Sequence, residues 1–228
     1  MAYQIQFSEV WPHLHALFWG ALLTLRLSAI SILAGLAIGL TCAFLRAVYP
    51  RASRPVIEAY VQVIRNTPFL VQIFLVYFGL PTVGIKLGAS EAGVLALALN
   101  TGAYLSEIFR AGVESIDRGQ IEAGRSVGLH RIQVFFLVIL QPALQVVYPA
   151  MTSQFVMVIL TSSVLCVISA EEMTAVANDL SSRTFRTIEI YLVVGLIYLA
   201  MTLFFSAFFR WIQRLIFPSQ RAIERAKR

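Results

Sequence analysis

The chain has 228 residues, of which 58% are hydrophobic and only 13% are charged. An average soluble domain carries about 25% charged residues, so the composition excludes an ordinary soluble protein and indicates an integral membrane protein. The formal net charge of +6 does not indicate nucleic-acid binding, because the basic residues lie at the ends of apolar runs.

Five apolar regions follow one another along the chain, and each is expected to supply one membrane-spanning helix. Such a helix needs about 20 residues to cross the hydrocarbon layer. The uncharged stretches are Leu27–Leu45, Asn66–Ile85, Ala92–Ser106, Ile132–Ala170 and Ile190–Phe209. Together they predict an all-α membrane protein with five spans, surrounded by lipid.

Two of these regions contain prolines that limit a simple helix. Pro68 is expected to interrupt and kink the second region, because proline cannot donate a backbone hydrogen bond inside a helix. The fourth region is too long for one span and carries Pro142 and Pro149 in its first half. We expect an entering helix there, then a span from about Leu144 to Leu165, then an outer tail.

The basic residues predict the orientation of the chain, since short cytoplasmic loops are enriched in Lys and Arg. With five spans and the N-terminus outside, 13 Lys and Arg residues lie in cytoplasmic segments and 3 lie in periplasmic ones. Splitting the fourth region into two spans, with the N-terminus inside, gives 7 basic residues inside and 9 outside. We therefore expect a periplasmic segment at 1–16, a membrane domain at 17–217 and a basic cytoplasmic tail at 218–228.

Polar side chains recur at helical spacing within the predicted spans, where such groups are costly and tend to face the protein interior. The three stripes are Glu58, Gln62, Arg65, Phe69 and Gln72; Asn100, Tyr104 and Glu107; and Gln154, Thr161 and Ser162. Any single member is better explained by hydrogen bonds between packed helices. Taken together, the stripes predict a solute path lined by Asn100, Tyr104, Gln154, Thr161 and Ser162. Glu58, Arg65 and Glu107 are expected to form a buried ionic group.

Cofactor and metal chemistry find no support in the sequence. Cys42 and Cys166 lie in apolar runs and are expected to be packing residues. The three histidines, His13, His15 and His130, are not spaced as a ligand set. No glycine-rich phosphate loop is present, so ATP is not expected to bind to this chain, and no catalytic or metal-binding residues are predicted.

A short polar stretch, Glu122-Ala123-Gly124-Arg125-Ser126-Val127-Gly128, separates two long apolar regions. It resembles the cytoplasmic EAA loop of permease subunits in ABC importers, which docks a coupling helix onto an ATPase subunit. The resemblance implies that Glu122, Ala123, Gly124 and Gly128 belong to the contact, within a cytoplasmic loop at 113–140. Two positions depart from the family pattern. Gly124 replaces the usual alanine, which costs a helix about 1 kcal/mol. The family's downstream Leu-Pro pair reads Leu140-Gln141-Pro142 here, so the proline comes one position later.

The resemblance extends over residues 17–217. There the sequence is similar to one family, the permeases of bacterial polar amino acid importers (histidine, glutamate, glutamine, arginine, opine). The matching segments are Gly20–Ser28, Arg65–Gln72, Tyr77–Pro81, Leu99–Gly112, Ser182–Arg186 and Glu189–Tyr191. It implies a type I importer fold in the bacterial inner membrane and a dimer, formed with a second copy or a sister permease. It also implies two cytoplasmic ATPases, which carry out the ATP hydrolysis, and a periplasmic substrate-binding protein.

One departure concerns the solute. Many family members carry a charged pair before the Thr-Ser of the fourth span, whereas this chain has Leu160-Thr161-Ser162-Ser163. Charged solute contacts are therefore not expected there. The segment Glu171–Ile188 mixes acidic and basic residues and is expected either to receive the binding protein or to be an ordinary solvated loop.

Two other function classes remain as alternatives. A secondary transporter would couple solute movement to ions through Glu58, Arg65 and Glu107, but the paired halves typical of such proteins are not seen. A membrane enzyme would need a nucleophile with a base, or a metal site, and neither pattern is present. Within the importer class, an opine or another amino acid derivative is an alternative solute.

Overall fold

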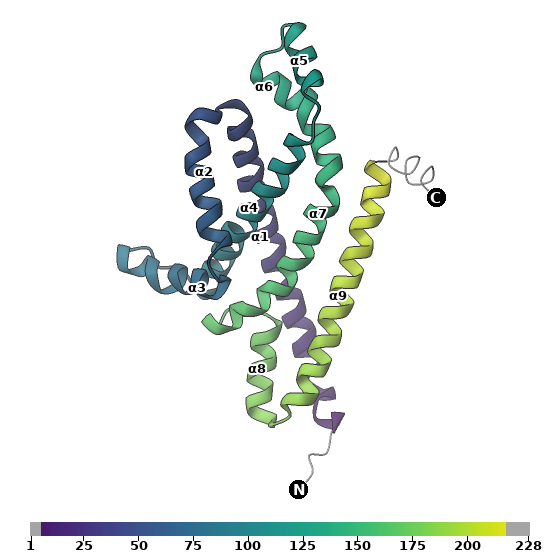
Figure 1. Ribbon diagram of the computed structural model, residues 1–228. Coiled ribbons are helices and arrows are strands. Elements are labelled where there is room, and N and C mark those ends of the chain that lie inside the picture. The colour runs from purple at the N-terminus through teal and green to yellow at the C-terminus, as the bar shows by residue number, and fades with distance from the viewer. Residues whose placement is uncertain (1–5, 218–228) are drawn as a thin grey trace. The chain divides into compact units, whose positions relative to one another are not determined.

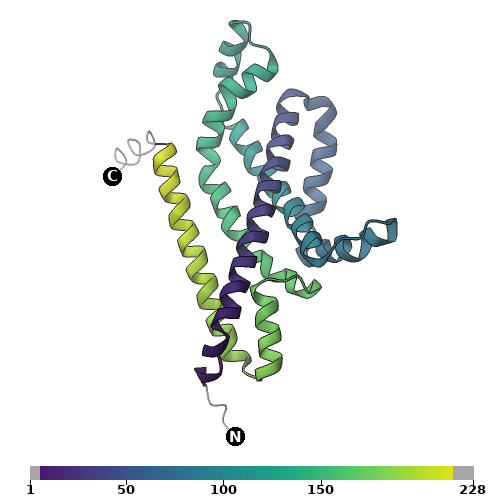
Figure 2. The same cartoon turned by 180° about the vertical axis from the view of Figure 1, so that it is seen from behind.

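The structure is a computed structural model, and it describes residues 6–217. The predicted basic tail at 218–228 and the first five residues of the predicted N-terminal segment lie outside the described residues. Within the described part of the chain, all regular elements are helical (Figures 1 and 2). The expectation of an all-α chain is therefore confirmed.

The first half of the chain forms four α-helices. Two short 3₁₀ turns, Phe7–Glu9 and Trp11–His13, lead directly into the first of them. The helices are α1 (Leu14–Val48), α2 (Pro50–Arg65), α3 (Phe69–Phe74) and α4 (Ala89–Glu114). A π-helical turn at Leu75–Gly79 and a 3₁₀ turn at Leu80–Val83 extend α3, and Gly84 ends this segment with φ +88°.

The second half, as far as Phe217, contains five α-helices. They are α5 (Arg118–Ser126), α6 (Arg131–Val134), α7 (Leu140–Thr161), α8 (Met173–Thr184) and α9 (Thr187–Ile216). A π-helical turn, Phe135–Ile139, joins α6 to α7, and a 3₁₀ segment, Ser162–Ile168, continues α7.

Among residues 6–217, four helical segments are long and apolar enough to cross a membrane, or up to five if the bent pair Pro50–Arg65 and Phe69–Val83 counts as one span. The four are Phe7–Val48, Ala89–Glu114, Arg131–Ile168 and Thr187–Ile216. These four coincide with four of the five predicted spans, and the bent pair overlaps the predicted span at 66–85. Two regions differ from expectation in how the helices are built.

The second region is broken rather than kinked. Helix α2 ends at Arg65 and α3 begins at Phe69, because Pro68 has no backbone N–H and disfavours helical geometry in the residue before it. The predicted five-residue polar stripe therefore does not lie on one helix, and Phe69 and Gln72 belong to α3. The stripe is continuous only from Glu58 to Arg65.

The fourth region is one helical stretch of 38 residues, not a separate entering helix followed by a span. The π-helical turn lies just before Pro142, and such a turn accommodates irregular backbone bonding inside a helix. Pro149 lies within α7. The prolines are thus absorbed by the helix and do not end it.

The chain divides into two compact units, each with its own apolar core. One unit comprises Met1–Leu33, Pro68–Ala98 and Val156–Phe204, and the other comprises Ala34–Thr67, Leu99–Phe155 and Phe205–Arg228. In the first unit, Ile73, Leu97 and Leu165 are almost fully buried in one cluster. Gly93 allows close packing there, because an added Cβ would lie 3.0 Å from Leu165.

The second unit contains two clusters that position the polar features described below. One cluster joins the end of α1 to α2 and α4 through Cys42, Ile57, Val61 and Ala103. The other is centred on Phe135 and holds the α5–α6 segment at one end of α7 (Figure 1).

Candidate functional site

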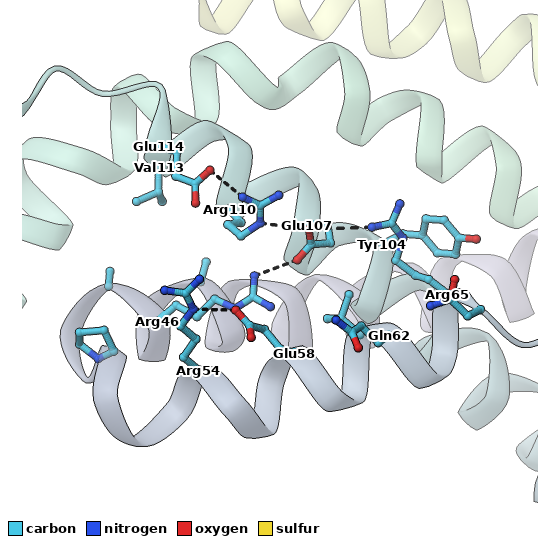
Figure 3. A pocket seen from close by; sticks show the side chains of 15 residues that line it. Arg46, Arg54, Glu58, Gln62, Arg65, Tyr104, Glu107, Arg110, Val113 and Glu114 are labelled. Carbon is cyan, nitrogen blue, oxygen red and sulfur yellow. Dashed lines mark hydrogen bonds and ion pairs between the residues drawn. The ribbon is translucent and has the colours of Figure 1, made fainter.

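A polar pocket of about 710 Å³ lies in the second unit (Figure 3). Its walls are the end of α1, one face of α2 and the second half of α4. Helix α2 is strongly amphipathic, so Ile57 and Val61 pack into the core while Glu58 and Gln62 lie toward the pocket. The lining residues are Ala43, Arg46, Ala47, Pro50, Arg54, Glu58, Val61, Gln62, Arg65, Asn66, Tyr104, Glu107, Arg110, Val113 and Glu114.

Glu107 is the centre of the charged network in this pocket. Arg46 Nη1 donates to Glu107 Oε1 at 2.8 Å, and Arg110 Nε donates to Glu107 Oε2 at 3.0 Å. Arg65 Nη1 lies 3.9 Å from Glu107 Oε2. The Arg46 and Glu107 side chains are only 11% and 20% exposed, so each charge depends on the other for compensation.

Further ion pairs extend the network in both directions. Arg54 Nε donates to Glu58 Oε1 at 2.6 Å, and Arg110 Nη1 donates to Glu114 Oε2 at 2.6 Å. Of the expected ionic group, Arg65 and Glu107 lie close together, whereas Glu58 is paired with Arg54 instead.

Sequence reasoning missed four charged members of the pocket. Three of them follow or precede an oppositely charged residue by three or four positions on the same helix, a spacing that indicates an ion pair and can be seen in the sequence. They are Arg54, Arg110 and Glu114. Arg46 gave no such signal, because its partner Glu107 lies 61 residues away on another helix.

The predicted path residues are distributed over both units. Tyr104 lines the pocket, and Asn100 lies one turn earlier on α4 and is half-buried. Gln154, on α7, is also half-buried and does not line the pocket. Thr161 and Ser162 belong to the first unit. Ser162 is fully buried, and its hydroxyl donates to Ile159 O at 2.7 Å, so this hydroxyl is already used within its own helix.

A helical hairpin formed by α5 and α6 holds the EAA-like motif. Asp117 caps α5 by accepting a hydrogen bond from Gly119 N at 2.7 Å. Gly128 turns the chain with φ +86°, a conformation that favours glycine. His130 and Gln133 form a reciprocal capping box at the start of α6. The turn between α5 and α6 thus depends on the backbone conformation of Gly128.

The hairpin has one packed face and one exposed face. Glu122, Ala123 and Val127 are exposed, and Val127 is an apolar side chain at 77% exposure. Gly124 is buried, and an added Cβ would lie 3.2 Å from Val138 Cγ2. Gly124 therefore serves the packing of the hairpin, and its place in the coupling surface stays a prediction.

A second polar group lies in the first unit, around the fully buried carboxyl of Glu172. Glu172 Oε1 accepts from Ala175 N at 2.7 Å and so caps α8. Its Oε2 accepts from Tyr198 OH at 3.1 Å and from Thr24 Oγ1 at 3.4 Å, while Thr24 Oγ1 accepts from Met173 N at 3.0 Å. The group ties α1, α8 and α9 together, so Glu172 does not belong to a solvated docking surface.

Replacement of Glu172 provides a test of this bonding. We expect Glu172→Gln to keep the fold, because an amide still accepts from Ala175 N and donates to Tyr198. We expect Glu172→Leu to lower the free energy of unfolding by about 1–3 kcal/mol for each donor left unpaired. Thermal unfolding of the purified protein in detergent measures both, and equal stability of the leucine and glutamine variants would contradict the assignment.

The same carboxyl predicts a pH dependence. Burial raises the pKa of Glu172, so the folded state retains a proton that the unfolded state releases near pH 4.3, the approximate ordinary value. Stability is therefore highest below that pH and falls as pH rises through the raised pKa. We expect Glu172→Gln to remove this contribution, as measured by unfolding across the acid range.

No group of three or more metal-ligating side chains is found among residues 6–217. The pocket is lined by ion pairs, amides and one phenol ring, groups that can form hydrogen bonds and charge interactions with a polar solute.

Comparison with known proteins gives a consistent result. The model of a family described as "Binding-protein-dependent transport system inner membrane component" matches residues 17–221. The chain is 34% identical over 213 residues to the glutamine transport system permease protein GlnP of Escherichia coli (strain K12), covering 92% of this chain and 97% of that protein. It is 35% identical over 209 residues to the nopaline transport system permease protein NocM of Agrobacterium fabrum, covering 87% of each chain.

A solved structure shares the fold. It is a crystal structure of an amino acid ABC transporter with histidines, 33% identical in sequence, with a TM-score of 0.84. The match covers 93% of this chain and 99% of that one.

Proposed function

Because this chain belongs to the family of binding-protein-dependent transport system inner membrane components, we propose that it is the permease subunit of an ATP-driven importer. The importer moves a polar amino acid across the bacterial inner membrane. The observation that carries this proposal is the similarity, over nearly the whole chain, to permeases of glutamine and nopaline transport systems.

The partners follow from the same proposal. Cytoplasmic ATPase subunits dock on the exposed face of the α5–α6 hairpin, where Glu122 and Ala123 lie. ATP hydrolysis takes place on those subunits, so this chain is a transport component and not an enzyme. A second permease, either a copy or a sister subunit, completes the membrane part. A periplasmic binding protein docks on the exposed residues of Glu171–Ile188, among which Asp179 and Arg183 form a surface ion pair.

The assembled complex provides the test. Co-expression with the adjacent genes of its operon should yield co-purified ATPase and binding-protein subunits. After reconstitution, ATP should drive uptake of at least one of L-glutamine, L-arginine, L-histidine or nopaline, and uptake should need the binding protein. Nopaline as the preferred solute would select the opine alternative. Uptake driven by an ion gradient without ATP would select a secondary transporter and overturn the proposal.

We further propose that the N-terminus is periplasmic and the C-terminus cytoplasmic, supported by the 13-to-3 charge bias. Cysteines introduced as Ala2→Cys and Ala226→Cys are expected to be labelled from opposite sides by a reagent that does not cross the membrane. Labelling of both from the cytoplasmic side would contradict the five-span orientation.

The solute path is proposed to include Asn100, Tyr104, Gln154, Thr161 and Ser162. Neutral donors and acceptors suit a zwitterion that must bind weakly and leave. A thiol introduced as Thr161→Cys is expected to react with an aqueous reagent in one nucleotide state and to be protected in another, since alternating access opens the path to one side at a time. Absence of reaction in both states would make these residues helix-packing groups.

A further inference from the structure

We propose that the pocket beside α2 binds the carboxylate of the transported solute, and that Arg65 receives it with the help of Gln62 and Asn66. The inference rests on the proposed function, because it names a subsite for an amino acid within the permease. It also gives Arg65 a role beyond the structural ion pair with Glu107.

Arg65 differs from the other three arginines that line the pocket. Arg46, Arg54 and Arg110 each donate a hydrogen bond to a carboxylate at 3.0 Å or less. Arg65 has a single ion-pair contact, at 3.9 Å from Glu107, and its guanidinium makes no hydrogen bond to another residue of the described chain. Its side chain is 43% exposed. Arg65 is therefore the pocket arginine with donors available to a ligand.

The guanidinium of Arg65 is nevertheless held in place. Its Cζ lies 5.2 Å from the centroid of the Tyr104 ring, a distance at which a cation is attracted to the ring face. Figure 3 shows Arg65 beside Tyr104, with Gln62 on the same stretch of α2. A planar guanidinium fixed in this way can bind a carboxylate through two parallel hydrogen bonds.

Two amide side chains lie next to this arginine. Gln62 precedes Arg65 by three residues, so both lie on one face of α2, and Asn66 follows it at the end of the helix. Gln62 and Asn66 are both exposed and line the same pocket. Their amide groups can donate to a carboxylate that the arginine has bound.

The pocket has the size and charge for such a ligand. A volume of about 710 Å³ falls within the range of small-molecule sites, roughly 300–1,000 Å³. The lining carboxylates, Glu58, Glu107 and Glu114, each already accept a hydrogen bond from an arginine. Their charges are thus compensated within the protein, and Arg65 supplies the excess positive charge that an anionic group requires.

Protection of an introduced thiol tests the proposal in the assembled complex. The reporter is Ala47→Cys, a position that lines the pocket but is assigned no contact with the carboxylate, in a background where Cys42 and Cys166 are replaced by alanine, with a charged thiol reagent. The probes are L-glutamine, L-arginine and L-histidine, each compared with its α-carboxamide. The amino acid that the complex imports should slow labelling, whereas its carboxamide should not.

Variants of the arginine sharpen this test. Arg65→Gln should raise the concentration needed for half-protection by about 10- to 100-fold, since hydrogen bonds to charged groups contribute about 1.5–3 kcal/mol. Arg65→Lys should give a smaller increase in that concentration, because lysine keeps the positive charge but cannot donate the two parallel hydrogen bonds of a guanidinium. Arg51→Gln is the matched control, since Arg51 is exposed on the same helix but does not line the pocket; it should leave protection within about threefold.

Four results would overturn the inference. Equal protection by an amino acid and its carboxamide would show that the carboxylate is not recognised. Protection before any solute is added, present in phosphatidylglycerol nanodiscs and absent in phosphatidylcholine nanodiscs, would assign the pocket to an anionic lipid. A complex that imports an amino acid but shows no protection would leave the proposed function standing and reject this subsite. A complex that imports none of these probes and no nopaline would reject both.

Discussion

Replacing Glu107 with alanine is expected to lower the free energy of unfolding by on the order of 3–5 kcal/mol, the usual cost of leaving a buried charge without its partner. Arg46 is nearly buried, and Glu107 is the carboxylate that its guanidinium binds. Nε and Nη2 of Arg46 are buried without hydrogen-bond partners among the described residues. Loss of Glu107 would therefore leave the whole guanidinium uncompensated.

Thermal unfolding in detergent and the yield of monodisperse protein measure this effect. Glu58→Ala is the control, because the Arg54–Glu58 pair is 73% and 44% exposed and should contribute only about 0–1 kcal/mol. The double variant Arg46→Met with Glu107→Met should be more stable than Glu107→Ala, since it removes both charges. Equal losses for Glu107→Ala and Glu58→Ala would contradict the central role of Glu107.

The second large effect is expected from Gly128→Val, which should abolish transport-coupled ATP hydrolysis while the permease still inserts. Gly128 has φ +86°, and a β-branched residue in this region is strained by about 1–3 kcal/mol. No atom lies within 4 Å of a Cβ added there, so the defect arises from backbone conformation and not from a clash. The strain should change the reversal between α5 and α6 and misplace the exposed face of the hairpin.

Gly128→Asn is the matched control, because asparagine tolerates this conformation better than other side chains. It should retain most of the ATPase stimulation by loaded binding protein. Glu122→Lys should reduce stimulation without reducing the amount of permease in the membrane, since Glu122 is exposed. Normal stimulation in both Gly128→Val and Glu122→Lys would show that the hairpin does not couple the subunits.

Local chemistry made several features predictable from the sequence. Proline at position 68 broke the helix, and glycine at position 128 supplied a turn, because these residues act through their own backbone. The polar face of α2 was visible for the same reason, since it depends only on helical spacing. The long apolar regions identified the spans by length and composition.

Contacts between distant segments could not be predicted in the same way. In the sequence, Arg46 is a basic residue at the end of an apolar run, and no neighbouring residue indicates its partner on α4. Glu172 seemed to belong to a charged loop, but it is fully buried because Thr24 and Tyr198 come from helices far along the chain. In both cases the decisive partner is set by tertiary packing.

The connection between α4 and α5 has a mechanical consequence. Only three residues separate Glu114, which lines the pocket, from the first residue of α5. They are held by backbone hydrogen bonds, including Ser115 N to Ala111 O and Ile116 N to Val113 O, and Ile116 packs against the core. Such a short link does not let α5 move independently of α4, since three residues span only about 10 Å even when fully extended. A displacement of the α5–α6 hairpin would therefore also displace the end of α4. Because Glu107, Arg110 and Glu114 lie along α4, that displacement would change the wall of the pocket.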